Sequence, residues 1–376
     1  MMQIVKESLF LTLVRLGIEK KTVNDSLLTV HVSNSIDWST MKDLAEKQEL
    51  SAVVLDGLNE LRVKSGELRV NLQEKILLAE WIGEVHHFYE QRYEQYARAI
   101  SSLAAFYNSH GFKMMVLKGY ACSLDWQKPE HRPCGDIDIW QFGQQKEADA
   151  ALEASFKIQD PSFKIDNSHH HHTVFYWRDF MVENHYDFVN THDYQSSKEL
   201  EVVFKELGRK DSFTAEVYGE TVFLPSPNLH ALFLIRHLVA HFTSTSVTLR
   251  QVLDWAFYVE KHTTEIDWKW LNVMIEMYQM KDFINCINAI CVEDLGFDAS
   301  IFPNVQFLPD LKEKVLNDIL FPKYTANEPS RMIPRLVYKY RRWQGNAWKQ
   351  ELCYSESRWS AFWSGIYGHL LKPKSI

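Results

Sequence analysis

Two aspartates, Asp136 and Asp138, occupy alternate positions in the otherwise apolar segment GDIDIW. Such alternation predicts a β-strand, in which residues i and i+2 point to the same face. Both carboxylates would then project together, while Ile137 and Ile139 face a buried interior. Paired carboxylates are hard oxygen ligands that suit Mg²⁺ or Mn²⁺. The alternative interpretation is a solvated strand face that carries two acids and no cation.

A divalent ion on this pair would have a defined chemistry. It can bridge a nucleoside triphosphate and neutralise charge on the attacking and leaving oxygens of a phosphoryl transfer. Because the ion would bind only the folded chain, Mg²⁺ or Mn²⁺ should raise the melting temperature. We expect Asp138→Asn to abolish this effect and, by removing like-charge repulsion, to stabilise the metal-free protein.

A second acidic segment, VENHYDF, places Glu183, His185 and Asp187 at positions i, i+2 and i+4. If this segment is a strand, one face carries all three side chains. It therefore offers candidates for a third carboxylate beside the aspartate pair. For His185 the alternative interpretation is a half-buried, hydrogen-bonded histidine without a role in chemistry.

Three further histidines, His230, His237 and His241, share one face of a predicted helix. The spacing of the last two is that of a zinc site, but a leucine follows His237 where a metalloprotease has its glutamate. The remaining interpretations are a lining of the nucleotide cleft, together with Arg236 or Arg250, and packing against the neighbouring domain. We favour packing.

A run of four histidines, His169–His172, leads directly into a strand pattern. Such a run could bind metal adventitiously. A solvated loop or strand entrance is the interpretation that we favour, and the role of the run stays open.

The elements that must position these residues fall into three regions. Residues 1–107 have helical spacing and include an N-cap at Asp37 and a long helix from Lys75 that ends at Gly111. Residues 108–224 alternate short strands with helices, and the strands include 169–177 and 181–189, joined near Arg178, and the single strand EVYGETVFL. Residues 225–376 return to helical spacing.

Composition limits the class of protein. A chain of 376 residues exceeds what one core usually fills, and a net charge of −8 argues against a nucleic-acid footprint over the whole surface. Five cysteines without a C-x-x-C pair indicate a reduced, cytoplasmic protein without a zinc motif. No segment is long and apolar enough to form a transmembrane helix. P-loop, dinucleotide-binding and hydrolase motifs are absent from the sequence.

The tail, residues 331–376, is basic and rich in tryptophan, with nine Lys or Arg against two Glu. It could pack on the acidic body, contact a polyanion such as tRNA, or lie on an anionic membrane surface. We favour packing, because exposed tryptophan clusters promote aggregation.

The order of parts carries a resemblance to a known superfamily. A strand that ends in Gly119, a short helix from Tyr120 to Trp126, and then GDIDI is the arrangement found in DNA polymerase β-like nucleotidyltransferases. The stretch LKGYACSL…HRPCGDIDIW resembles the core motif of a bacterial branch, the uncharacterised nucleotidyltransferases, which have a helical region on each side. The flanking helices are similar too, so the resemblance covers roughly residues 35–295.

This resemblance implies an α+β fold with a polymerase β-like mixed sheet between helical regions. It implies Mg²⁺-dependent transfer of a nucleoside monophosphate from an NTP to a hydroxyl of a small molecule, sugar, protein or tRNA. Asp136 and Asp138 match the metal-binding pair. Glu183 matches the third carboxylate, which shares the metal and deprotonates the hydroxyl, with Asp187 as second choice. His185 would orient a carboxylate or phosphate.

The phosphate side of the site departs from the superfamily pattern. Gly119 matches the glycine whose backbone approaches the triphosphate, but Tyr120 follows it in place of a small hydroxyl residue. Lys118 or Ser123 could replace the missing contact. Arg132 could clamp phosphate, because guanidinium binds phosphate bidentately, or it could be an ordinary surface arginine.

Two alternatives to this enzyme follow from the same residues. The departure at Tyr120 allows a non-catalytic nucleotide- or ligand-binding module that retains the fold. The basic tail allows an enzyme that modifies nucleic acid, or one of toxin type. The acceptor, the NTP and the oligomeric state are not determined by the sequence.

Overall fold

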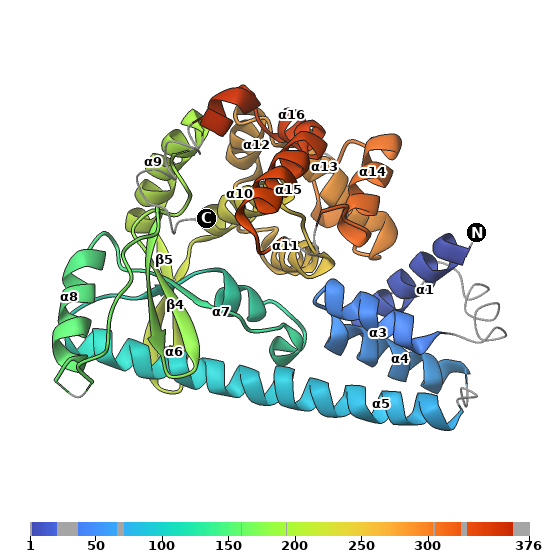
Figure 1. The fold of residues 1–376 in the computed structure, drawn as a ribbon, viewed down its shortest axis with the longest axis horizontal. Helices are drawn as coiled ribbons and strands as arrows, with labels where there is room; N and C mark the ends of the chain where they lie inside the picture. Colours follow the sequence, from blue (N-terminus) through green and yellow to red (C-terminus); the bar gives the residue numbers. More distant parts are fainter. Residues whose placement is uncertain are drawn as a thin grey trace.

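The computed structural model describes residues 2–20, 37–65, 71–158, 160–192, 194–303, 305–324 and 329–363. Among these residues, the first helices are α1 (Met2–Gly17), α3 (Trp38–Lys47) and α4 (Ser51–Ser65), which pack together at one end of the molecule (Figure 1). Asp37 caps α3 as predicted, since its carboxylate accepts a hydrogen bond from the Thr40 amide at 3.2 Å.

A long helix joins this end of the molecule to the sheet. It consists of α5 (Leu72–Val85), a π-helical turn η1 (His86–Gln91) and α6 (Arg92–Ser109). It starts slightly before the predicted Lys75, because Asn71 and Glu74 form a reciprocal capping box. Gly111 follows its last turn, as predicted. Figure 1 shows this helix running beneath the sheet, where α6 packs against β5 and β6.

Six strands form one mixed sheet in the order β3-β4-β2-β1-β6-β5. Their bounds are β1 (Met115–Val116), β2 (Ile137–Trp140), β3 (His172–Trp177), β4 (Phe180–His185), β5 (Ser212–Val217) and β6 (Glu220–Pro225). β2 lies parallel to β4 and antiparallel to β1. Ile137 and Ile139 are fully buried under the sheet, as the alternation predicted. The predicted α+β class is therefore confirmed.

Two predicted segments of the sheet region differ from the structure. The segment EVYGETVFL is not one strand, because Tyr218 and Gly219 both have positive φ and form the turn between β5 and β6. The short helix α7 (Lys118–Ser123) begins and ends earlier than the predicted Tyr120–Trp126. Helices α8 (Gln145–Phe156) and α9 (Gln195–Lys210) complete the region.

The C-terminal part is helical. Its longer helices are α10 (Pro227–Ser244), α11 (Leu249–His262), α12 (Trp268–Met277), α13 (Lys281–Ala289), α14 (Pro309–Leu320), α15 (Met332–Gly345) and α16 (Ala347–Cys353). The chain turns between α12 and α13 at Gln279, which has positive φ. None of the helices built from the described residues has the length and apolar character needed to cross a membrane.

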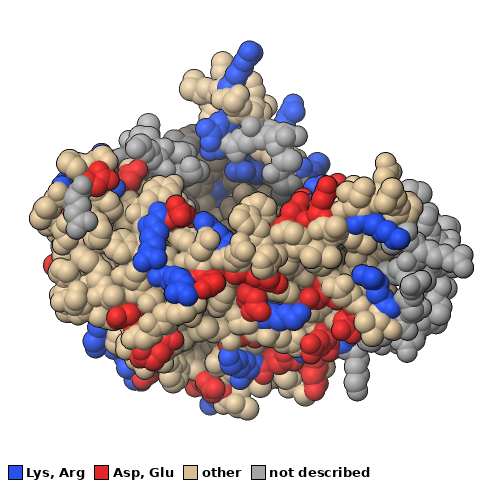
Figure 2. Space-filling view, turned by 90° about the horizontal axis from the view of Figure 1, so that it is seen from below, with Lys and Arg blue, Asp and Glu red and all other residues tan. Residues whose placement is uncertain are grey.

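The tail packs on the body in part. In α16, Lys349 and Cys353 are buried, whereas α15 has no buried residue. Residues 364–376 of the tail lie outside the described residues. Figure 2 shows the face along which the long helix runs, where acidic and basic side chains are intermixed.

Candidate active site

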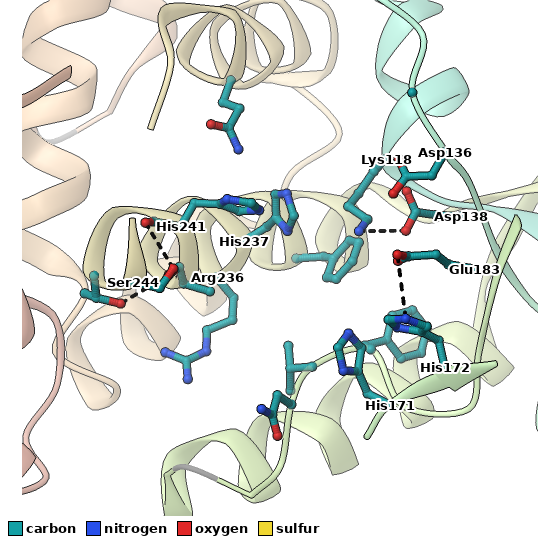
Figure 3. A pocket seen from close by; sticks show the side chains of 18 of the residues that line it. Lys118, Asp136, Asp138, His171, His172, Glu183, Arg236, His237, His241 and Ser244 are labelled. Carbon is teal, nitrogen blue, oxygen red and sulfur yellow. Dashed lines mark hydrogen bonds and ion pairs between the residues drawn. The ribbon is translucent and has the colours of Figure 1, made fainter. Parts of the chain in front are cut away.

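A cavity of about 1220 Å³ opens where the sheet, the N-terminal helices and the C-terminal helices meet. The carboxyl end of β4 and the segment before β2 form one wall, and α10 forms the opposite wall. Figure 3 shows Asp136, Asp138 and Glu183 on the first wall, facing Arg236 and His237 across the opening. Residues far apart in the sequence therefore share one chamber.

The strand register brings the predicted carboxylates together. β2 and β4 are parallel neighbours, and Asp138 pairs directly with Glu183. Asp136 immediately precedes β2 and lies on the same side as Asp138. Asp138 is only 2% exposed, so this wall is not the solvated strand face of the alternative interpretation.

Lys118 neutralises part of this acidic wall. Its Nζ lies 2.7 Å from Oδ1 of Asp138. Burial alone would lower the pKa of Lys118, but Asp138, Asp136 and Glu183 outweigh it and raise the pKa. Lys118 is thus a charged residue at the first position of α7, on the cavity wall.

His185 is the second partner of Asp138. Its Nε2 lies 2.9 Å from Oδ1 of Asp138, and its Nδ1 lies 3.1 Å from the carbonyl oxygen of Asp187. Burial disfavours the imidazolium, yet the hydrogen bond to Asp138 and the nearby Glu183 carboxylate prevail and raise the pKa of His185 to about 9. His185 therefore orients a carboxylate in this structure, the kind of role expected from the resemblance.

The three carboxylates have different electrostatic surroundings. The charge of Asp138, followed by burial, raises the pKa of Asp136 to about 6. Burial also acts to raise the pKa of Asp138, but Lys118 and His185 hold it well below its ordinary value. Burial is likewise outweighed at Glu183, where the neighbouring His185 lowers the pKa of the carboxyl. Asp138 and Glu183 are therefore ionised at neutral pH.

Position 119 requires glycine because α6 and α7 approach each other closely there. A Cβ at this position would lie 2.4 Å from Oη of Tyr96 on α6. That hydroxyl donates a hydrogen bond to the carbonyl oxygen of Asp136 at 2.7 Å. Gly119 thereby lets α6 hold the backbone at the start of β2, and it also lines the cavity.

Other predicted residues are engaged elsewhere. Arg132 lines the cavity, but its guanidinium is clamped by Asp254, with contacts of 2.8 Å and 3.0 Å, so it is neither an exposed arginine nor a free phosphate clamp. Among the described residues that line the cavity, neither Ser123 nor Asp187 is found. Ser123 donates to the carbonyl oxygen of Tyr120 at 2.7 Å, and Asp187 pairs with Lys205 on α9.

The departure at Tyr120 has a packing explanation. Tyr120 is 7% exposed and its ring lies against those of Tyr93 and Tyr96 on the long helix. It therefore belongs to the core beneath α7. The two residues before it, Lys118 and Gly119, line the cavity instead.

The histidine run is a strand entrance, since β3 begins at His172, but it is not a solvated loop, because it forms part of the cavity wall. His170 and His172 are each 6% exposed, and His170, His171 and His172 all line the cavity. Burial lowers the pKa of His171 to about 2 and that of His172 to about 4, so both are neutral. The signal available in the sequence was the run's position directly before β3, which pairs with the strand of Glu183.

The opposite wall comes from α10. Arg236, His237 and His241 face the cavity, whereas His230 lies in a separate pocket beside Tyr258. His237 and His241 thus line the cavity, whereas His230 packs between helices as we favoured. Nη1 of Arg236 is buried and has no hydrogen-bond partner within the described part of the chain.

The donor chemistry of the acidic wall fits a divalent cation. Asp136, Asp138 and Glu183 supply hard oxygen donors, and Lys118 leaves part of their charge uncompensated. Asp138, Glu183 and His185 bring one potential ligand atom each to within 4.8 Å of one another. Residues of this chain could therefore hold Mg²⁺ or Mn²⁺.

Comparisons with known proteins agree with the resemblance seen in the sequence. A family model described as "Uncharacterised nucleotidyltransferase" matches residues 34–296, which contain the whole sheet and all three carboxylates. Among solved structures, an antigenic nucleotidyltransferase-like protein from Paracoccidioides brasiliensis is similar at 14% identity and a TM-score of 0.33, covering 55% of this chain and 96% of that one. No curated protein matches the chain.

Proposed function

The chain belongs to the uncharacterised nucleotidyltransferase family, and from this premise we propose that it transfers a nucleoside monophosphate from an NTP to a hydroxyl of an acceptor, with Mg²⁺. The observation that carries the proposal is the convergence of Asp136, Asp138 and Glu183 on one cavity wall, with Asp138 and Glu183 in direct register. A cavity of about 1220 Å³ has room for a nucleotide and part of an acceptor.

In this proposal each side chain has a distinct task. Asp136, Asp138 and Glu183 would hold Mg²⁺, which, when bound, supplies positive charge to the phosphates. Lys118 and the backbone at Gly119 face the phosphate side of the cavity. Glu183 is ionised and reaches into the cavity, so it can accept the proton of the attacking hydroxyl.

The wall formed by α10 suits the triphosphate or an anionic acceptor. Arg236 lines the cavity, its buried Nη1 has no hydrogen-bond partner within the described residues, and a guanidinium can bind phosphate bidentately. His237 and His241 lie on the same wall (Figure 3). Burial lowers the pKa of His241 to about 4, so it offers a neutral imidazole rather than a charge.

The test is label transfer from each α-labelled NTP in the presence of Mg²⁺ and fractionated cell lysate. We expect label on one acceptor class with the wild type. Glu183→Gln should lose transfer while it retains nucleotide binding, because loss of a base acts on the chemical step. Asp187→Asn is the matched control, since Asp187 pairs with Lys205 and should leave transfer near wild type.

One observation favours the alternative of a non-catalytic binding module. Lys118 Nζ and His185 Nε2 both contact Oδ1 of Asp138, the oxygen that would face a cation. Under this alternative, nucleotide raises the melting temperature equally with and without Mg²⁺, and no NTP yields label transfer. Transfer that is lost in both Asp138→Asn and Glu183→Gln would reject it.

A further inference from the structure

A second set of potential ligands lies next to the carboxylates. His171, His172 and His185 each place a ring nitrogen within 4.8 Å of the others. The antiparallel pairing of β3 with β4 sets His172 directly opposite His185, and His171 precedes His172 on the same wall. Neither the family description nor the proposed nucleotidyl transfer assigns a role to the histidine run.

Two of these histidines lack the partners that buried polar groups normally have. His172 is 6% exposed, and neither of its ring nitrogens has a hydrogen-bond partner within the described residues. Nδ1 of His171 is also buried and unpartnered in that part of the chain. Leaving such groups unsatisfied destabilises the folded chain, so a bound species that uses their lone pairs would explain them.

Glu183 has the position of a fourth ligand. Its Oε1 lies 3.6 Å from Nε2 of His172, and its Oε2 lies 3.6 Å from Nε2 of His185. These separations are too long for hydrogen bonds. They match two ligands of one ion, because donors about 2.0–2.1 Å from a tetrahedral metal lie about 3.4 Å apart.

The surroundings of His185 also suit a metal ligand. Its Nδ1 is paired with the carbonyl oxygen of Asp187 at 3.1 Å, and its Nε2 lies 2.9 Å from Oδ1 of Asp138 and 3.6 Å from Oε2 of Glu183. A metal ion on Nε2 would replace the hydrogen bond to Asp138, and the proton on that nitrogen would be released to solvent. A backbone carbonyl on the second nitrogen is the usual way in which a metal-ligating histidine is oriented.

We propose that His171, His172, His185 and Glu183 form a binding site for a transition-metal ion of the Zn²⁺ class. Three imidazoles and one carboxylate favour such an ion over Mg²⁺, which prefers oxygen ligands. The site is separate in chemistry from the Asp136–Asp138 pair, and Glu183 belongs to both. It does not depend on nucleotidyl transfer, and its test contains no nucleotide.

The test uses the full-length chain produced without a polyhistidine tag and stripped with a chelator. The protein is titrated with Zn²⁺ against a chromophoric competitor in excess Mg²⁺, and separately with Co²⁺ while the visible absorption is recorded. We expect one Zn²⁺ per chain, undisturbed by Mg²⁺, and the intense Co²⁺ absorption of a four-coordinate site. His172→Gln and Glu183→Gln should each weaken Zn²⁺ binding by about tenfold or more.

Two variants serve as matched controls. His170→Asn alters the same run and the same cavity, and His241→Gln alters the opposite wall, but neither residue belongs to the proposed set, so both should bind Zn²⁺ like the wild type. Equal weakening by His170→Asn and His172→Gln would mean adventitious binding to the run and would overturn the proposal. Weak Co²⁺ absorption, typical of a six-coordinate ion, in the wild type would also overturn the proposal. This measurement does not require that His172→Gln folds.

Discussion

Asp136 and Asp138 are two residues apart, yet their surroundings are opposite. Asp138 is held between Lys118 and His185, at 2.7 Å and 2.9 Å. Asp136 is destabilised as an anion by the neighbouring Asp138 and by burial, which raise its pKa to about 6. Lys118 and His185 therefore compensate the charge of Asp138, whereas the repulsion that the sequence indicated destabilises the charged form of Asp136.

The substitutions Asp136→Asn and Asp138→Asn should consequently have opposite effects on the metal-free protein. Asp136→Asn removes the disfavoured charge and should raise the melting temperature at pH 7. Asp138→Asn leaves Lys118 and His185 without their buried carboxylate and should lower the free energy of unfolding by about 3–5 kcal/mol. This replaces the expectation that Asp138→Asn stabilises, which assumed an unpaired Asp138.

Thermal and urea unfolding of chelator-treated protein measure both effects. With Mg²⁺ added, both variants should lose the metal-induced rise in melting temperature that we expect of the wild type. Stabilisation of the metal-free protein by Asp138→Asn would show that Lys118 and His185 do not support Asp138 in solution.

At the scale of elements, three segments must approach closely to hold the carboxylates. The hydroxyl of Tyr96 on α6 passes Gly119 on α7 to reach the backbone of Asp136 before β2. The hydrogen bond from the Leu117 amide to the carbonyl oxygen of Asp138 adds a second tie, at 2.9 Å. The position of the aspartate pair is thus set by packing between a helix and a loop as well as by the sheet.

Gly119→Ala should break this arrangement, because its Cβ would lie 2.4 Å from Oη of Tyr96. Relief of such an overlap typically costs about 1–3 kcal/mol, and it would displace the Tyr96–Asp136 hydrogen bond. We expect a lower melting temperature and a weaker response to Mg²⁺. Gly83→Ala is the control, since nothing lies within 4 Å of its Cβ and alanine favours the helix. Similar melting temperatures for both variants would contradict the close approach.

At the scale of the whole molecule, the cavity exists because ion pairs and hydrogen bonds join regions that are far apart in the sequence. Asp254 on α11 binds Arg132 from the sheet region and Arg250 from its own helix, and Arg250 in turn binds Glu49 from the N-terminal helices. Gln48 adds direct hydrogen bonds, to the amide of Leu249 at 2.9 Å and the carbonyl oxygen of Ile319 at 2.8 Å.

Asp254→Asn should therefore destabilise the whole molecule. It leaves the buried Arg132 guanidinium without a counter-ion, which costs about 3–5 kcal/mol. Glu276→Gln is the control, because its ion pair with Lys281 lies on the surface, where solvent screens it and its loss should leave stability near that of the wild type. Urea denaturation at pH 7 measures both. Equal stability of the two variants would show that the network does not hold the regions together.

Because of the same ion-pair network, the free energy of unfolding should decrease at acid pH. Burial acts to raise the pKa of Asp254, but Arg132 and Arg250 outweigh it and lower the pKa below the ordinary value of 3.8. A carboxyl group whose pKa is lower in the folded than in the unfolded chain stabilises the fold. This stabilisation is fully present above the unfolded-state pKa and is lost as the pH falls through the folded-state pKa. Stability measured between pH 5 and pH 2 should fall less steeply in Asp254→Asn than in the wild type.

The tail contributes to the same assembly through α16. Lys349 is 1% exposed and lies 2.5 Å from Asp318, and Trp348 packs edge-on against Phe242. Tyr354 stacks on Tyr194 with ring centroids 3.8 Å apart.

Deletion of residues 331–376 should accordingly give an insoluble or strongly destabilised protein, whereas a chain that ends at Ser357 keeps α16 and should remain soluble. Expression, solubility and thermal unfolding of the two truncations decide this. A soluble 1–330 chain that melts like the full length and loses only tRNA or liposome binding would instead make the tail a binding segment. Polyanion contact through residues 331–376 stays a prediction.

The sequence by itself determined what depends on local spacing and chemistry. Alternation at Asp136 and Asp138 predicted a strand with paired carboxylates, the cap at Asp37 and the end of the long helix at Gly111 were local signals, and the order of motifs identified the family. These features follow from backbone periodicity and turn chemistry, which neighbouring residues determine.

Only the tertiary structure decided which side chains meet. Arg132 bound Asp254, 122 residues away, instead of facing the cavity as a free cation. His170, His171 and His172 line the cavity because β3 pairs with β4, and α10 supplied Arg236 from beyond the sheet. Such pairings depend on burial and on charge compensation between distant segments. A buried charge needs a partner, and the chain's local pattern does not say which distant residue provides it.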